Sequence, residues 1–328
     1  MRRWSEVPVL RRLEPFVVAI LLAVLLAALV PAGGAVATGF SWGTTLGVGL
    51  LFFVYGARMA PAEAVAGLRN WRLQGAVAAT TFLLFPLLGL LLAFLVGGLL
   101  DDGLLAGLLF LAALPSTVQS CVVFTALARG NVPGAVVSAT VSNLAGIGLT
   151  PLLAALLLGS SGAGPDAGSV GRILLQLLAP FLLGLVAGRW VGDWLRAHRR
   201  RLGVLDRGVI VAVVYAAFSR GVRQGVWQEV GAGEVVVVLA CAAVFLAAVL
   251  AVTWWTPRLW HADRADRVTI AFCGSNKSLA TGLPMATVLF DPHVVGLVAL
   301  PVILYHPLQI TVCSFLAGRL GRAPLLQG

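Results

Sequence analysis

Charged side chains are scarce in this chain. Asp, Glu, Lys and Arg make up 11% of its 328 residues, hydrophobic residues make up 59%, and the mean hydropathy is +0.98. About a quarter of the residues in soluble globular domains are charged, so this composition excludes a water-soluble globule. Membrane spans of about 20 residues with short connections would use the whole length. We therefore predict a polytopic membrane protein that forms a single membrane domain over residues 1–328.

Cysteine and histidine are also few, with four of each. All four cysteines lie in apolar stretches, which excludes a disulfide framework in the loops. They are Cys121, Cys241, Cys273 and Cys313. Only one histidine, His306, lies in an apolar stretch, so neither a metal cluster nor a Ser-His-Asp triad can be assembled at one membrane depth. We expect no enzymatic activity, no catalytic residue, no cofactor, and no metal other than sodium.

Lysine is almost absent, because Lys277 is the single lysine and the other 22 basic residues are arginines. The arginines form short clusters between apolar runs, a pattern typical of membrane topology and not of a nucleic-acid-binding surface. Lys277 instead lies inside the apolar stretch 271–280. An ammonium at membrane depth costs at least ~2.5–3.5 kcal/mol, and substrate or ion pathways are the usual reason for retaining one. The alternative is a lysine that snorkels from a helix end to the interface.

Ten apolar segments are long enough to be membrane spans. They are Phe16 to Ala32, Phe40 to Met59, Leu73 to Gly97, Leu104 to Ala128, Val132 to Leu158, Ile173 to Gly192, Leu205 to Ser219, Val235 to Trp255, Val268 to Leu289 and Val294 to Leu316. Runs of this length exceed the strands of a barrel, and backbone groups in lipid must be paired within the segment. The predicted fold is all-α, with ten transmembrane helices.

The arginines predict the orientation of these spans. All except Arg172, Arg220 and Arg223 fall at the termini or in every second loop. Cytoplasmic loops are rich in arginine and lysine, so both termini are expected in the cytoplasm and the protein in the cell membrane (inner or plasma membrane), surrounded by the lipid bilayer. A cleavable signal peptide ending near Ala35-Val36-Ala37 is an alternative that would leave nine spans.

Ten spans with both ends on one side divide into two halves of five, and the second half must then insert upside down. This predicts inverted repeats over residues 12–160 and 170–318. The fourth span of each half is interrupted by helix breakers, which are Pro115 in the first half and Gly274, Gly282 and Pro284 in the second. Polar residues surround the breakers: Ser116, Thr117, Gln119 and Ser120 in the first half, and Ser275, Asn276, Lys277 and Ser278 in the second.

Interrupted helices leave backbone carbonyls unpaired, and such groups survive at membrane depth only where they line a cavity or meet a partner. Paired interruptions in two halves therefore indicate a transport site. Ordinary kinked helices are the alternative. We interpret five further prolines in the spans in that way, namely Pro86, Pro151, Pro180, Pro301 and Pro307.

Four motifs along the chain resemble the bile acid:sodium symporter family, solute carrier family 10, and its SBF-like branch most closely. They are residues 115–120, 128–133, 138–143 and 272–279. The resemblance covers essentially the whole chain. It implies a core domain of residues 73–158 with 235–316, a panel domain of residues 14–60 with 173–223, and fourth and ninth helices that are broken where they cross. It also implies secondary active transport of small organic, anionic and amphipathic solutes by alternating access.

The sequence departs from the bile-acid-transporting branch at the sodium site. That branch has a Glu four residues before a Gln-Asn pair in the ninth helix, and here Ala271 occupies the Glu place, Ser275 the Gln place and Asn276 the Asn place. Thr81 stands where that branch has a Gln, and Lys277 adds an ammonium one residue beyond Asn276. Losing a carboxylate and gaining a cation changes the local charge by two units. We therefore expect Lys277 to take the place of a coupling cation.

We expect the ammonium of Lys277 to be held by Gln119, Ser120, Asn143 and freed carbonyls of the fourth helix. The full set of expected substrate- and ion-binding residues is Lys277, Asn276, Ser275, Ser278, Gln119, Ser120, Thr117, Ser116, Asn143, Ser142, Thr140 and Thr81. Because burial disfavours the charged form of lysine, exchange of a proton by Lys277 is a second hypothesis. Ordinary sodium coupling, a channel, and a non-transporting membrane regulator remain alternatives.

Overall fold

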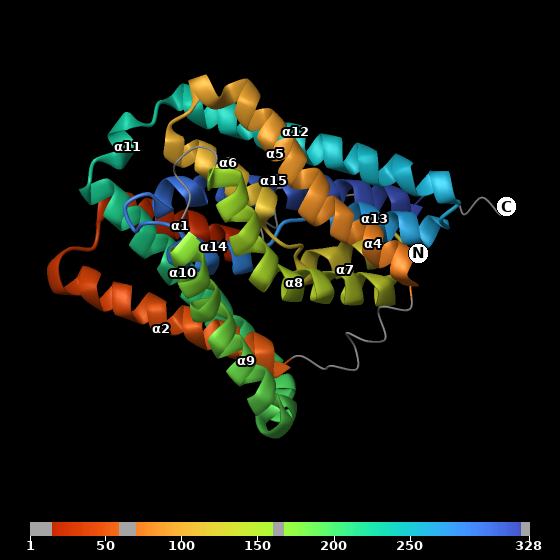
Figure 1. Cartoon of the computed structure of the whole chain (residues 1–328), viewed down its shortest axis with the longest axis horizontal. Coiled ribbons are helices and arrows are strands. Elements are labelled where there is room, and N and C mark those ends of the chain that lie inside the picture. Colours follow the sequence, from red (N-terminus) through yellow and green to blue (C-terminus); the bar gives the residue numbers. More distant parts are fainter. Residues whose placement is uncertain (1–14, 59–69, 160–166, 323–328) are drawn as a thin grey trace, which may run out of the picture.

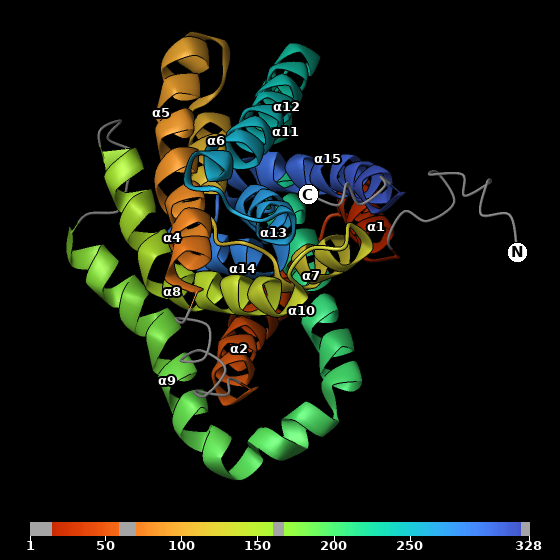
Figure 2. The ribbon, with the colours of Figure 1, turned by 90° about the vertical axis from the view of Figure 1, so that its right-hand side faces the viewer.

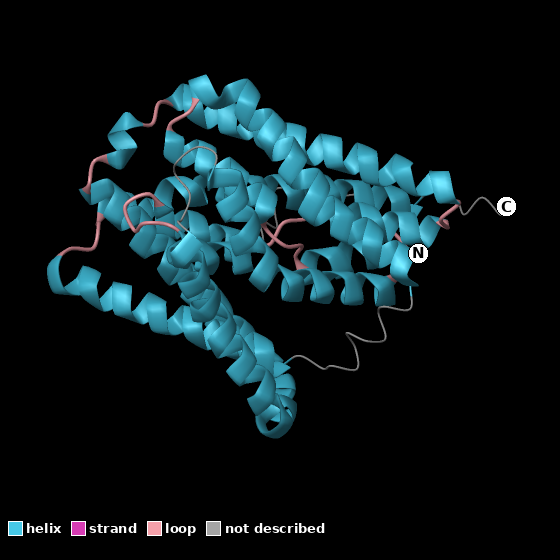
Figure 3. Ribbon diagram, viewed as in Figure 1, coloured by secondary structure: helices cyan, strands magenta, loops and turns pink. Residues whose placement is uncertain are grey.

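A computed structural model describes residues 15–58, 70–159 and 167–322. Within these ranges every regular element is a helix, and the rest is loop (Figure 3). The prediction of an all-α fold is thus confirmed for the described part of the chain. The arginines at positions 2, 3, 11, 12 and 69, on which the orientation partly rests, lie outside the described residues.

The helices follow the predicted apolar segments. They are α1 (Pro15–Leu29), α2 (Gly34–Arg58), α4 (Trp71–Ala79), η3 (Thr80–Leu84), α5 (Phe85–Val96), η4 (Gly97–Leu99), α6 (Asp102–Ala113), α7 (Val118–Leu127), α8 (Val132–Gly159), α9 (Ala167–Ala197), α10 (Arg199–Arg223), α11 (Val226–Glu229), α12 (Ala232–Trp255), η5 (Thr256–Trp260), α13 (Arg264–Ser275), α14 (Leu279–Leu289) and α15 (Val295–Arg322).

Several of these helices have the length and composition of membrane spans. In the described residues, 7 helical segments are long and apolar enough to cross a membrane, or 8 if α6 and α7 form one bent span. Helix α1 is apolar but shorter, with 15 residues. The chain is therefore a multi-pass membrane protein, as the composition predicts.

Both predicted interruptions are present. Helix α6 ends at Ala113, α7 begins at Val118, and the two are bent by 59°. Leu114 is extended because the residue before a proline avoids the helical conformation. The second interruption separates α13 from α14, which starts after Ser278, whose side chain accepts a hydrogen bond from the backbone N–H of Thr281.

Helices α1, α2, α9 and α10 pack chiefly on one another. Helix α2 lies along α9, and α1 lies along α10 (Figures 1 and 2). Glycines allow the first pair to touch through their backbones: a Cβ on Gly56 would lie 2.0 Å from the carbonyl oxygen of Phe181, and one on Gly184 would lie 2.0 Å from that of Phe53. Small residues at such crossings are the usual route to close helix packing in membranes.

Helices α6 and α13, which lead into the two breaks, lie in the interior of the remaining helices. Residues Gly103–Ala113 of α6 are buried except Leu105, and Val268–Ser275 of α13 are buried throughout. Helix α15 packs on α6, and α12 packs on α13. This arrangement places the two unwound segments, 114–117 and 276–278, away from the outer surface of the bundle.

Candidate ion and substrate site

The ammonium of Lys277 lies inside the protein. The residue is 1% exposed, and Nζ donates hydrogen bonds to the backbone carbonyls of Thr81 (3.0 Å), Ala112 (2.9 Å) and Leu114 (2.6 Å). The ring of Phe85 lies with its centroid 4.0 Å from Nζ. A lysine ammonium has three protons to donate, so these three acceptors satisfy it completely. The side chain therefore does not snorkel to an interface.

Two of the three carbonyls come from the end of α6. The last carbonyls of a helix have no partner within it and carry partial negative charge. Pro115 lacks an N–H and keeps Leu114 extended, so no further turn covers these carbonyls. The break in the fourth predicted span thus leaves carbonyl oxygens without a partner in the helix, and their partial negative charge attracts an ammonium.

The third carbonyl comes from a π-helical turn. In η3 the backbone N–H of Phe85 donates to the carbonyl of Thr80, one residue earlier than in an α-helix. The next donor in a π pattern would be residue 86, which is a proline and has no N–H. The carbonyl of Thr81 is therefore left for Lys277. The sequence signal was Pro86, which we interpreted as an ordinary kink.

The remaining carbonyls of the first break also receive donors from other helices. That of Ala113 accepts from the Thr150 hydroxyl (2.9 Å), that of Pro115 from the Ser278 N–H (2.9 Å), and that of Ser116 from the Asn143 amide (2.5 Å). The second of these bonds joins the two unwound segments directly. Unwound backbone at membrane depth must be paired in this way.

Helix α15 satisfies the backbone of the second break. The Gln309 side chain accepts from the N–H of Lys277 (2.7 Å) and donates to its carbonyl (2.9 Å), and the Tyr305 hydroxyl donates to the Ser275 carbonyl (2.7 Å). From the other break, the Ser116 hydroxyl donates to the Cys273 carbonyl (2.6 Å). Gln309 and Tyr305 were missed in the sequence, since a single polar residue in an apolar helix does not reveal its partner.

Part of the predicted site forms one polar cluster. The N–H of Ser116 donates to the Ser142 hydroxyl (3.0 Å), and the Thr281 hydroxyl donates to the Asn143 side-chain oxygen (2.9 Å). The hydroxyls of Ser278 and Thr281 are 2.8 Å apart. These contacts bring α6, α8 and α14 together around the crossing.

The predicted side-chain ligands of the ammonium need correction. Nζ is bound by backbone carbonyls, while Gln119 is exposed and Ser120 is half-buried on α7. The Asn143 amide binds the carbonyls of Ser116 and Ala139. The prediction of freed carbonyls from the fourth helix was correct. Backbone carbonyls bind the ammonium in place of the predicted side chains, because the three carbonyls accept all three of its protons.

The side chains of several other predicted residues bind backbone carbonyls one turn earlier in the chain. The side chains of Thr140, Ser275 and Asn276 each donate to the carbonyl four residues earlier. Thr117 is half-buried next to the first break. Among the described residues, the hydroxyl of Thr81 and the side-chain oxygen of Asn276 are buried without a hydrogen-bond partner.

Ionic partners for Lys277 are lacking in the described part of the chain, where no carboxylate lies within 4.0 Å of Nζ. No group of three or more His, Cys, Asp or Glu that could hold a metal ion occurs there either. The positive charge at the crossing is therefore compensated by carbonyl dipoles, a helix end and an aromatic ring, and not by an acid.

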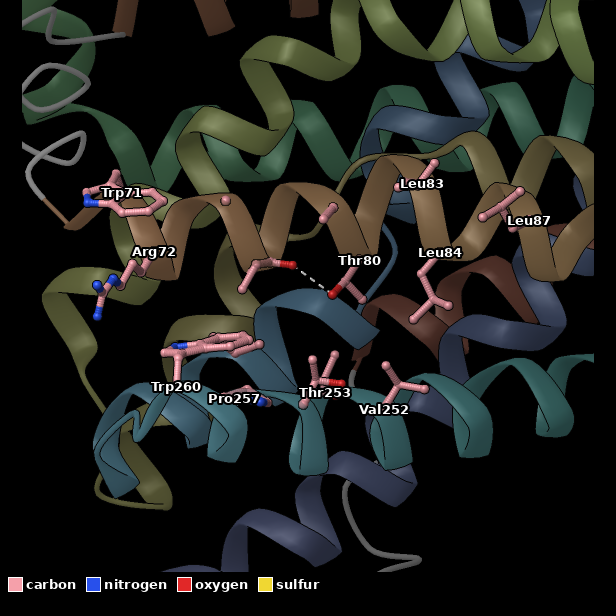
Figure 4. Close-up of a pocket in the computed structure, with 15 residues that line it drawn as sticks. Trp71, Arg72, Thr80, Leu83, Leu84, Leu87, Val252, Thr253, Pro257 and Trp260 are labelled. Carbon is pink, nitrogen blue, oxygen red and sulfur yellow. Dashed lines mark hydrogen bonds between the residues drawn. The ribbon is translucent and has the colours of Figure 1, made fainter.

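A mainly apolar groove lies on the other side of the π-helical turn (Figure 4). It has a volume of about 620 Å³ and runs between α4–α5 and α12–η5, with Trp71, Arg72 and Trp260 at one end. Thr80 lines this groove and also packs on the second broken span, since a Cβ on Gly274 would lie 3.0 Å from its methyl group. A molecule in the groove would thus contact the turn whose carbonyl holds Lys277.

Comparison with known proteins places these features in a family. The model of the SBF-like CPA transporter family matches residues 14–322. The uncharacterized protein PA2026 of Pseudomonas aeruginosa is 47% identical over 310 residues, covering 94% of this chain and 93% of the relative. The putative symporter YfeH of Escherichia coli is 43% identical over 312 residues, covering 95% and 94%. Sodium/bile acid cotransporter 7 of Rattus norvegicus is 27% identical over 274 residues, covering 83% and 81%.

Proposed function

Because the chain belongs to the SBF-like CPA transporter family and is thus a membrane transporter of the bile acid:sodium symporter type, we propose that it moves small organic anions by alternating access. In this proposal the ammonium of Lys277 takes the place of a coupling sodium ion. The observation that carries this proposal is the set of three backbone carbonyls around a buried Nζ at the crossing of two broken helices.

The charge at the crossing supports this role for Lys277. Oxygen dipoles surround Nζ as they would surround an alkali cation, and no described carboxylate neutralises it. Two unit charges 4 Å apart repel by about 4 kcal/mol at an effective dielectric constant of 20. Placing a sodium ion beside the ammonium would cost free energy of this order. The charge of Lys277 therefore prevents sodium from binding at the crossing.

The same geometry limits a role in proton coupling. A neutral amine has one proton fewer to donate, which would leave one of the three carbonyls unpaired at a cost of ~1–3 kcal/mol. If Lys277 exchanges a proton during transport, the loss must therefore accompany a rearrangement of one of the three segments that hold it. Coupling of that kind links protonation to the conformational step.

The packing supports a division into two moving parts. In this proposal, ten spans form inverted repeats over 12–160 and 170–318. The panel domain (14–60 with 173–223) contains α1, α2, α9 and α10, which pack chiefly on one another. The core domain (73–158 with 235–316) contains both breaks and every described residue given above as a contact of Nζ. The arginine distribution supports an orientation with both termini in the cytoplasm of the cell.

Uptake into proteoliposomes tests the proposal. A thermal-shift screen of bile salts, steroid sulfates and short organic anions first selects the ligand that stabilises the purified protein most. Uptake of that ligand in radiolabelled form should then saturate, and its rate should be the same under an imposed sodium gradient and under a choline gradient of equal ionic strength. Uptake that rises steeply with the sodium gradient would refute the role of Lys277, and an absence of saturable uptake would refute transport.

A further inference from the structure

A second pocket lies far along the chain from Lys277, between the start of α2 and the end of α10. It has a volume of about 430 Å³ and is lined by Gly34, Ala37, Ser219, Arg220 and Arg223, together with Ala32, Phe40, Ala216 and Gln224. Two of its lining residues are arginines and none is acidic. Of the described carboxylates, none is within 4.0 Å of either guanidinium. The pocket therefore carries positive charge that the described structure does not neutralise.

The guanidinium of Arg223, an exposed residue, is hydrogen-bonded to the connection between α1 and α2. Its Nη1 donates to the carbonyl of Ala32 (3.2 Å), and a Cβ on Gly33 would lie 2.3 Å from the same nitrogen. A side chain at position 33 would therefore displace the guanidinium from its present position. Arg220 is three residues earlier on the same helical face. Both arginines thus line the pocket beside the start of α2.

The start of α2 adds a second source of positive potential. The helix is 25 residues long and begins at Gly34, which lines the pocket together with Ala37 in the first turn. The first backbone N–H groups of a helix have no partner within it and carry partial positive charge. Helix N-termini bind phosphate and carboxylate groups for this reason.

Ser219 supplies an independent sign that the pocket binds a ligand. It lines the pocket, is 2% exposed, and its hydroxyl has no hydrogen-bond partner among the described residues. A serine within a helix usually donates to the carbonyl one turn earlier, and this one does not. A buried hydroxyl without a partner is costly, so an acceptor oxygen from a ligand would remove that cost.

We propose that this pocket binds an oxyanion, the phosphate or carboxylate group of a ligand, between Arg220, Arg223, the Ser219 hydroxyl and the first turn of α2. Bidentate contacts of arginine with such groups are short and strong. The oxyanion is either a free anion or the head group of an anionic phospholipid, since both present the same oxygens. The site is separate from the crossing at Lys277 and does not depend on the transport mechanism.

Binding measurements on the purified, delipidated protein test this site. Inorganic phosphate is titrated by calorimetry at fixed ionic strength, and retention of phosphatidylglycerol over phosphatidylcholine is measured by native mass spectrometry. We expect saturable binding of at least one of the two probes. Phosphate binding would identify a free anion as the ligand, whereas phosphatidylglycerol retention alone would identify a lipid.

Two variants locate the binding. The double variant Arg220→Gln with Arg223→Gln should weaken it by roughly tenfold or more. Ala37→Glu places a carboxylate in the pocket, and it should fold because an acidic residue near a helix N-terminus is stabilising, yet it should abolish binding. The control Arg319→Gln removes a charge from α15, outside the pocket, and should bind as the wild type does. Binding of neither probe, or equal binding by the wild type and Ala37→Glu, overturns the proposal.

Discussion

Replacing Lys277 by alanine should destabilise the protein and create a response to sodium. The change leaves the carbonyls of Thr81, Ala112 and Leu114 without their donor. Each unpaired buried acceptor costs ~1–3 kcal/mol, while removing the buried ammonium recovers several kcal/mol of desolvation. We expect a net loss of about 2–4 kcal/mol. At roughly 2 °C per kcal/mol for a chain of this size, Tm falls by about 4–8 °C.

Sodium should restore part of this loss in the variant, because the vacated position keeps oxygen ligands and loses the competing charge. A ligand present at 100 times its Kd stabilises by about 2.7 kcal/mol. The assay is thermal unfolding of the purified wild type and of Lys277→Ala in sodium chloride and in choline chloride at equal ionic strength. Arg322→Ala, which also removes one positive charge but from an exposed position on α15, is the control. An unchanged Tm for Lys277→Ala, or the same sodium response in both variants, would show that the reasoning is wrong.

Two further predictions concern the helices around the site. Pro86→Ala supplies an N–H that competes with Nζ for the carbonyl of Thr81. Uptake of the ligand selected by the thermal screen should therefore fall, while Tm stays equal or rises. Unchanged uptake would contradict this prediction. Gly184→Ala places a Cβ 2.0 Å from a backbone oxygen of α2 and should lower Tm by several degrees. The control Gly171→Ala, with no atom within 4 Å of its Cβ, should not lower Tm. Equal Tm values for the two variants would contradict the close crossing of α2 and α9.

Much of the helix layout could be predicted from the sequence because the lipid environment leaves few alternatives. A long apolar run must form a helix, and a proline among polar residues must interrupt it. Pro115 and the segment around Asn276 therefore predicted both breaks. Lys277 could be placed in the interior for the same reason, since an ammonium needs compensation wherever it is buried.

The partners of Lys277 could not be predicted in full. Side chains are visible in a sequence, whereas the carbonyl of Thr81 is available only because a π-helical turn shifts the pairing before Pro86. The prediction favoured Gln119 and Ser120 because they are polar and near the break. Helix α7 turns by 59° after the break, and such a change of direction leaves no trace in local composition. Gln309 is distant in sequence and was found only through its bonds to the Lys277 peptide.

The backbone and side chain of one residue connect four segments of the chain. Through Lys277, η3, the end of α6 and α15 are all tied to the second unwound segment. Hydrogen bonds weaken steeply as their geometry departs from the optimum, so a small displacement of any one segment breaks a contact without forming another. Intermediate positions are then penalised, and the assembly should switch between discrete arrangements instead of deforming gradually. If the protein changes conformation as proposed, Lys277 would couple the movements of these segments and make that change cooperative.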